Sequence, residues 1–352
     1  MPKCGMAFLQ EPEPQRGTLL PVLPSISRIV ARNPGVMTYH GTNTYFIEGE
    51  SGISILDPGP NDAQHVADIL AAAGGKPVTR IVLTHSHYDH MGAAPALQQA
   101  TGAPIAAFHK SGLENYTADI ALFDNSELAG LTAVHTPGHA PDHLCYQHIL
   151  PDGRKVLFSG DHVMSWSSSV VSPPSGDMLA YYRSLEKVIA RDDAFYLPGH
   201  GPALPKPQSL AAQLLAHRQK REDSILAALR EQGWSVAALA AELYAKSDPA
   251  LKVSATRNVL AHMLKLKAEG VVVENEPDPN LHPDIASLPP RPVGPLPPGV
   301  TQDTIDQSRA DTRRRFALRC AACSTALRPR YAVCGRGCLP AEGERKDNPD
   351  HA

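Results

Sequence analysis

The sequence of 352 residues predicts an α/β protein in which two β-sheets lie between helices. Short apolar runs typical of strands alternate with helical segments through the first 200 residues. Four of the strand-like runs end in a turn rich in Gly, Ser or Thr that carries a His or an Asp. After residue 200 the pattern becomes mainly helical, and after residue 277 it becomes rich in proline.

The elements of the first part follow from local patterns. Strands are expected at residues 25–31, 42–48, 53–57, 81–83, 105–108, 131–134, 155–158 and 195–197. Helices are expected at residues 62–73 and 179–190. Asn61 or Asp62 would cap the first helix, because a short polar side chain satisfies free backbone N–H groups, and the Gly pair at 74–75 would end it.

The second part predicts a smaller domain. Helices are expected at residues 209–232, 235–244 and 255–268, followed by a strand at 270–274. The last helix carries the basic residues Arg257, His262, Lys265 and Lys267, which would suit a nucleic-acid surface. Several glutamates nearby balance this charge, so a lid or a dimer surface is the favoured alternative.

The remaining residues, 277–352, predict a proline-rich linker and a tail. The four tail cysteines are spaced for a structural zinc, but they have few apolar neighbours, so a disordered tail is the favoured interpretation. These cysteines are Cys320, Cys323, Cys334 and Cys338. At the other end, residues 1–20 are expected to be a flexible N-terminus.

Composition limits the function classes. The net charge of −3 argues against a generally basic nucleic-acid coat. Only Cys4 and Cys145 lie outside the tail, which suits a reducing compartment. We find neither an apolar signal core at the start nor a segment long enough to span a bilayer. The sequence therefore predicts a cytoplasmic protein without a membrane partner, and it leaves the oligomeric state open.

A histidine-rich segment, THSHYDH at residues 84–90, follows the apolar run 81–83 directly. Histidine is the commonest metal ligand, and a turn after a buried strand can direct several side chains into one cavity. Alternation along an extended chain places His85 and His87 on one side. The alternative is a histidine-rich surface loop, which the rigid strand in front disfavours. Four ligand-type side chains in one segment indicate more than one metal ion.

Later turns carry further side chains of the same type. Each of His139, Asp161 and His200 follows one of the expected strands. Taken alone, any one of them would be interpreted as a cap or an ordinary loop residue. Because they agree in chemical type and in position relative to a strand, we expect the strand ends to converge on one centre.

These motifs resemble those of the metallo-beta-lactamase superfamily in kind and order. The later motifs are TPGH at 136–139, SGDH at 159–162 and PGHG at 198–201, and GTNTY at 41–45 and ILDPGP at 55–60 are similar to the family's opening strands. The resemblance implies an αββα sandwich for residues 21–230 and a winged-helix-like domain for residues 231–276. It narrows to the group that contains beta-lactamase-like protein 2, through TPGHAPDHLC, GDHVMSWS, SPPSGDM and HRQKRE.

The resemblance also implies a set of ligands for two zinc ions per chain. By position, His85, His87 and His139 would bind the first zinc, Asp89, His90 and His200 the second, and Asp161 would bridge both. Asp57 resembles the family's supporting carboxylate, which orients ligands; the alternative is a turn residue before Pro58. Imidazole and carboxylate donors suit zinc, with Mn²⁺ and Fe²⁺ as alternatives.

Such a centre predicts a hydrolase. Two zinc ions that share a water would provide a bridging hydroxide near neutral pH, and Asp89 would steer it and carry its proton. We expect either a catalytic role for His143, as a donor to the substrate oxygen, or a role in closing its own loop. The expected substrate is a small acyl thioester or ester. The alternatives are single-stranded RNA, as the group resemblance implies, and a non-catalytic metal-binding scaffold.

Overall fold

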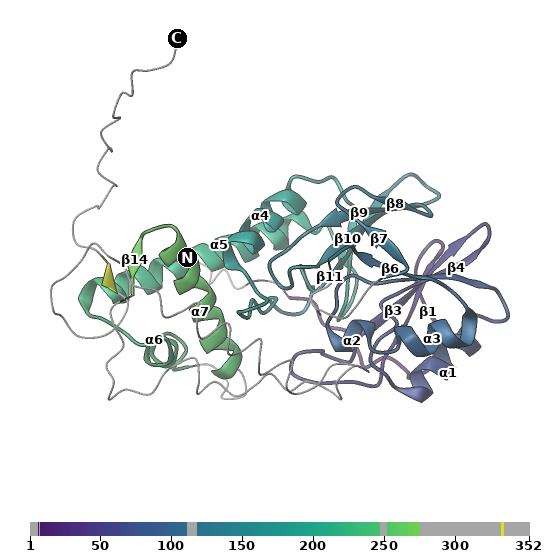
Figure 1. Ribbon diagram of the computed structural model, residues 1–352, viewed down its shortest axis with the longest axis horizontal. Helices are drawn as coiled ribbons and strands as arrows, with labels where there is room; N and C mark the ends of the chain where they lie inside the picture. The colour runs from purple at the N-terminus through teal and green to yellow at the C-terminus, as the bar shows by residue number, and fades with distance from the viewer. Residues whose placement is uncertain (1–5, 7, 111–117, 247–251, 275–331, 334–352) are drawn as a thin grey trace, which may run out of the picture.

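Two β-sheets lie face to face with helices on their outer sides, and a smaller helical unit follows (Figure 1). The structure is a computed structural model that describes residues 6, 8–110, 118–246, 252–274 and 332–333. None of the helices among these residues has the length and apolar character needed to cross a bilayer.

The first sheet has seven strands in sequence order. They are β1 (Leu20–Leu23), β2 (Ile26–Val30), β3 (Asn43–Gly49), β4 (Gly52–Leu56), β5 (Val78–Val82), β6 (Ile105–Phe108) and β7 (Ile120–Leu122). The strands from β1 to β4 pair antiparallel, and those from β4 to β7 pair parallel. Side chains alternate between the two faces, so Tyr45 faces the second sheet whereas Phe46 faces the helices.

The second sheet has six strands in the order β13-β12-β11-β10-β9-β8. They are β8 (Glu127–Leu128), β9 (Leu131–His135), β10 (Leu144–Ile149), β11 (Lys155–Gly160), β12 (Phe195–Pro198) and β13 (Leu204–Pro205). Only the pair β11 and β12 is parallel. Tyr146 and Phe158 pack against Tyr45 and Val82 of the first sheet, which buries the space between the sheets.

Helices complete the sandwich. They are α1 (Ala63–Ala72), α2 (Tyr88–Met91), α3 (Ala94–Thr101), α4 (Met178–Ile189) and α5 (Gln208–Glu231). The Asp62 carboxylate, one of the two predicted caps, caps α1 by accepting from the backbone N–H groups of Gln64 and His65. Helices α1 and α3 cover the first sheet, and α4 and α5 cover the second. These layers form the αββα sandwich that the sequence predicted.

The smaller unit contains α6 (Val236–Leu243), α7 (Lys252–Ala268) and β14 (Val272–Val273), which pairs antiparallel with β15 (Ala332–Val333). Its core also takes in the end of α5, through Ile225 and Leu229. The beginning of α5, by contrast, packs on the second sheet. Helix α5 therefore belongs to both units and connects them (Figure 1).

The N-terminal segment differs from the predicted flexible residues 1–20. Among the described residues, Phe8 and Leu9 pack against the core, and the Leu9 N–H donates to the Ser165 carbonyl. Glu11 pairs with Arg28 at 2.5 Å. Apolar burial and an ion pair therefore hold residues 8–11 in place. The four tail cysteines and Cys4 lie outside the described residues.

Candidate metal centre

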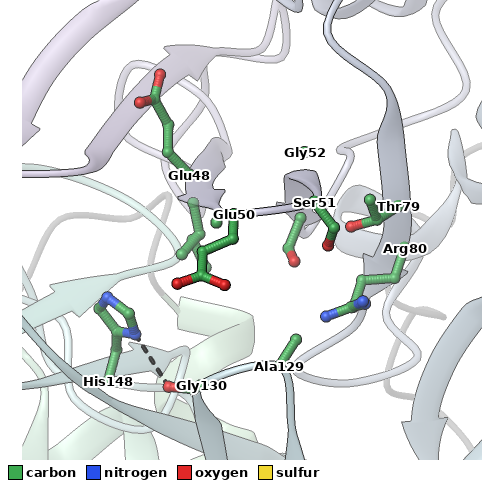
Figure 2. A pocket seen from close by; sticks show the side chains of 12 residues that line it. Glu48, Glu50, Ser51, Gly52, Thr79, Arg80, Ala129, Gly130 and His148 are labelled. Atoms are coloured by element: carbon green, nitrogen blue, oxygen red, sulfur yellow. Dashed lines mark hydrogen bonds between the residues drawn. The ribbon is translucent and has the colours of Figure 1, made fainter.

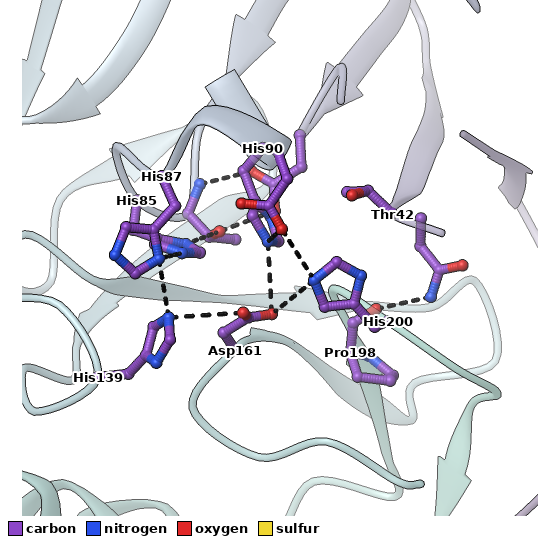
Figure 3. A network of polar contacts seen from close by, with 12 residues as sticks. Thr42, His85, His87, His90, His139, Asp161, Pro198 and His200 are labelled. Carbon is purple, nitrogen blue, oxygen red and sulfur yellow. Dashed lines mark hydrogen bonds and ion pairs between the residues drawn. The ribbon is translucent and has the colours of Figure 1, made fainter. Parts of the chain in front are cut away.

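Seven side chains from four segments that follow strands meet at one end of the sandwich (Figure 3). His85, His87, Asp89 and His90 follow β5, while His139, Asp161 and His200 follow β9, β11 and β12. Their ligand atoms form three overlapping groups in which all atoms lie within 4.8 Å of one another. The groups are His85 with His87 and His139; His85 with His90 and Asp161; and Asp89 with His90 and His200.

The first group brings ring nitrogens together. His87 Nδ1 lies 2.8 Å from His85 Nε2 and 2.9 Å from His139 Nε2. The Thr84 hydroxyl donates to Asp57, so it accepts from His85 Nδ1 at 2.9 Å, and the Val170 carbonyl accepts from His139 Nδ1 at 2.7 Å. Both Nε2 atoms therefore direct lone pairs at His87 Nδ1, which carries at most one hydrogen. In at least one of these two contacts, therefore, a lone pair of one ring faces a lone pair of the other. This arrangement is the one expected when both nitrogens bind the same cation.

In the third group, Asp89 with His90 and His200, the Nδ1 atoms of both rings are again the donors. His90 Nδ1 donates to Asp57 Oδ2 at 2.8 Å, and His200 Nδ1 donates to the Gly41 carbonyl at 3.3 Å. The Nε2 atoms of both rings are buried and have no hydrogen-bond partner. They lie 3.7 Å and 3.3 Å, respectively, from Asp89 Oδ2. Burial opposes charge on His90, but the carboxylates of Asp161, Asp57 and Asp89 raise its pKa well above the ordinary value. These carboxylates therefore attract positive charge to this position, which a bound divalent cation would supply in place of a proton.

The Asp161 carboxylate lies between the first and the third of these groups. Its Oδ1 is 3.4 Å from His90 Nε2 and 3.5 Å from His200 Nε2, whereas its Oδ2 is 3.5 Å from His139 Nε2. Burial alone would raise the pKa of Asp161, but the imidazoles of His200 and His90 hold it well below its ordinary value. The carboxylate is therefore ionised and offers one oxygen to each group.

Burial also sets the protonation of His85. Loss of water around the ring, reinforced by the neighbouring imidazoles, lowers the pKa of His85 well below its ordinary value. A neutral imidazole is the form that binds metals.

Backbone geometry allows these side chains to approach. A Cβ at Gly199 would lie 2.6 Å from His90 Cε1 and 2.8 Å from Asp161 Oδ1, so a larger residue would displace the cluster. The Asn43 side chain donates to the carbonyls of Pro198 and Gly201, on either side of His200. The opening motif at 41–45 thus holds the last ligand turn.

Comparison with known proteins agrees with this geometry. Residues 37–200 match the model of the metallo-beta-lactamase superfamily, and residues 235–278 match the beta-lactamase associated winged helix domain. An Aspergillus chevalieri protein named atrochrysone carboxyl ACP thioesterase is 30% identical over 236 residues, which cover 64% of this chain and 74% of the relative. The chain belongs to the metallo-beta-lactamase superfamily.

Other relatives cover more of the chain. A Drosophila melanogaster protein named beta-lactamase-like protein 2 homolog is 28% identical over 268 residues, covering 70% of this chain and 89% of the relative. The crystal structure of a beta-lactamase domain protein from Burkholderia ambifaria has a TM-score of 0.63 at 22% identity, covering 75% of this chain and 92% of that one, and supports the fold. The predicted superfamily and its winged helix domain are thus confirmed. The prediction that the protein is a metal-dependent hydrolase is confirmed with them.

The hydrogen bonds of His143 favour the loop-closing role that the sequence left open beside a catalytic one. Its Nε2 accepts from the Asp161 backbone N–H at 3.1 Å, so its Nδ1 donates to the Thr136 hydroxyl at 2.9 Å. Burial lowers the pKa of His143 well below its ordinary value. Because both nitrogens are used within the protein, the ring positions Asp161 and has no hydrogen to offer a substrate.

Other side chains of the motifs shared with the family have structural contacts. Asp177 caps α4 by accepting from the Ala180 N–H at 2.9 Å, and Trp166 stacks on Tyr39 at 5.0 Å. Cys145 is buried, and burial raises the pKa of its thiol to about 12, as suits a small core residue.

Sequence analysis anticipated Asp57, which accepts from His90 and Thr84, but it missed other groups that orient the cluster. Asp142 is buried and accepts from the Ser86 N–H at 3.0 Å, which fixes the backbone between His85 and His87. Its place three residues after His139 was an available signal. The carbonyls of Gly41 and Val170 have no signal, because every residue carries one.

A cavity of about 530 Å³ lies away from the cluster (Figure 2). Glu50 of the β3–β4 turn, Arg80 of β5 and His148 of β10 line it. The cavity is lined by Gly52, where β4 begins, whereas Asp57 follows the end of β4 and contacts His90 of the cluster. The cavity therefore lies at the opposite end of the sandwich from the metal centre.

Proposed function

We propose that this protein is a dinuclear zinc hydrolase that cleaves a small acyl thioester or ester. The observation that carries the proposal is the Asp161 carboxylate, whose two oxygens face two separate groups of imidazoles. His85, His87 and His139 would hold one zinc, and Asp89, His90 and His200 the other, with Asp161 shared. No thiolate is among these seven ligands, and imidazole with carboxylate suits zinc.

When bound, two zinc ions would supply a bridging hydroxide at neutral pH and polarise the substrate carbonyl. The chain's own residues would do the rest. Asp89 is the most exposed of the carboxylates in the centre, with 23% of its side chain accessible, so it is placed to exchange a proton with substrate or solvent. As the hydroxide oxygen bonds to the carbonyl carbon, Asp89 would accept the hydroxide proton. It would then pass that proton to the thiolate released when the carbon–sulfur bond breaks.

Two observations favour a thioester over RNA. The relatives named thioesterase reach 31% identity, in Aspergillus fumigatus. In addition, two of the lysines of α7 pair with glutamates: Lys265 with Glu222 at 2.7 Å and Glu269 at 2.8 Å, and Lys267 with Glu274 at 2.5 Å. Paired cations contribute little to phosphate binding. These contacts also mean that substituting Lys265 would disturb packing, and would not be a clean test for RNA.

The test is turnover of acyl thioesters, esters and a single-stranded RNA by the zinc-loaded protein. His139→Ala removes a proposed ligand, and His148→Ala changes a histidine at the distant cavity as the matched control. Thioester turnover that is lost in His139→Ala and kept in His148→Ala would support the proposal. RNA cleavage without thioester turnover would mean that the substrate is RNA. Turnover by His139→Ala equal to that of His148→Ala and the parent would refute the metal centre.

A further inference from the structure

The orientation of His139 depends on one backbone carbonyl. The Val170 carbonyl accepts from His139 Nδ1 at 2.7 Å and directs Nε2 at the cluster. Val170 lies in the connection between β11 and α4, where residues 161–177 form no helix or strand. Neither a helix nor a sheet therefore fixes this carbonyl, and its position depends on what holds the connection.

Contacts on both sides of Val170 come from the two long helices. On one side, Arg218 of α5 donates to the Ser169 carbonyl through its NH2 group. On the other, Asn258 of α7 accepts from the Val171 N–H at 3.1 Å. Arg218 and Asn258 are joined, because NH1 of the arginine donates to the same Asn258 oxygen at 2.9 Å. The pair thus clamps residues 169–171.

Asn258 is the centre of this clamp. Its Oδ1 accepts two hydrogen bonds, and the guanidinium of Arg218, which is 4% exposed, can only donate. Without that oxygen, the Val171 N–H and one Arg218 N–H lose their partner in a buried place. Asn258 belongs to the segment that matches the winged helix domain, whereas His139 belongs to the catalytic domain.

We propose that Asn258 positions His139 through residues 169–171, so that the winged helix domain sets metal affinity at the first zinc site. This inference rests on the proposed function, because it takes His139 as a zinc ligand. Helix α7 then serves the catalytic centre directly. Its neighbouring Arg257 supports the same connection by donating to the Ser172 hydroxyl at 2.8 Å.

Two substitutions separate positioning from packing. Asn258→Asp keeps an oxygen for both donors, whereas Asn258→Leu has similar volume and no acceptor. Lys265→Met is the matched control, because it breaks the contacts of α7 with Glu222 and Tyr182 but does not touch residues 169–171. Thermal unfolding of the apo proteins would show whether Asn258→Leu and Lys265→Met lose a similar amount of stability.

The decisive measurement is zinc affinity of the full chain, by competition with a chromophoric chelator, with Co²⁺ absorption as a second readout of ligand geometry. We expect Asn258→Leu to bind one of its two zinc ions about 10–100-fold more weakly, as loss of a group that orients a ligand does. Asn258→Asp and Lys265→Met should bind both as the parent does. We also expect a lower kcat with KM nearly unchanged in Asn258→Leu.

The outcomes distinguish the two proposals. Parent-like zinc affinity in Asn258→Leu, or equal weakening in Lys265→Met, would overturn the positioning role alone. His139→Ala is the reference for the metal assignment and should lose one zinc ion. If it retains two, or if the parent protein binds none, the proposed function fails together with this inference.

Discussion

Replacing Asp57 by asparagine should invert the hydrogen-bond polarity of one half of the metal centre. Asp57 is fully buried and accepts three hydrogen bonds: from the Thr84 N–H at 2.8 Å, from the Thr84 hydroxyl at 2.7 Å and from His90 Nδ1 at 2.8 Å. Its φ of 51° lies in the left-handed region that asparagine adopts readily, so the backbone should tolerate the change.

The side-chain amide introduced by Asp57→Asn has two possible orientations. Placing its NH2 against the Thr84 N–H would set two donors face to face, at a cost of about 1–3 kcal/mol. The favoured orientation points the NH2 at His90 Nδ1, which must then accept. The hydrogen of His90 moves to Nε2 and points into the centre, where a metal ligand needs a lone pair.

We expect Asp57→Asn to bind the second zinc about 10–100-fold more weakly, or about 1.4–2.8 kcal/mol. Chelator competition measures this affinity. Asp193→Asn is the matched control, since Asp193 is also a buried carboxylate but pairs with Arg191 at 2.6 Å, at the start of β12. Parent-like zinc affinity in Asp57→Asn would show that Asp57 does not set the tautomer of His90.

Two further predictions concern packing and pH. Gly199→Ala should destabilise the apo protein by about 1–3 kcal/mol in urea unfolding, because its Cβ would overlap His90 and Asp161; an unchanged midpoint would contradict this. Burial raises the pKa of Glu222, but His262 and Lys265 outweigh it and lower that pKa below 4.5. The stabilisation is therefore present above pH 4.5 and is lost as the pH falls through the folded pKa. Unfolding free energy should fall less between pH 5 and pH 3 (roughly the range over which carboxyl groups titrate) in Glu222→Gln than in the parent; parallel curves would refute the ion pair's role.

The ligand cluster could be predicted because each ligand is a side chain of distinctive type at the end of an apolar strand. Among the strands that were missed, β8 (Glu127–Leu128) and β13 (Leu204–Pro205) have two residues each and show no alternation. The role of His143 was left open because it depends on the Asp161 N–H and the Thr136 hydroxyl, which only the folded chain brings to its ring.

The face of α7 that packs against the rest of the protein could not be predicted from the sequence, for a related reason. Its cations follow one another along the helix, but their main partner, Glu222, lies on α5, 43 residues before Lys265. A charge pattern within one helix reports composition, whereas exposure depends on the face that packs. The sequence did indicate that nearby glutamates balance the positive charge of α7, and Glu269 and Glu274 do pair with Lys265 and Lys267.

The metal centre owes its lone pairs to acceptors from different parts of the fold. Asp57 after β4 serves His90 directly and His85 through Thr84, and the Gly41 carbonyl before β3 serves His200. Both lie beside strands of the first sheet, which fixes them. The acceptor of His139 lies in an irregular connection that α5 and α7 hold. Of these ligands, His139 is therefore the one whose geometry a change in the winged helix domain can reach.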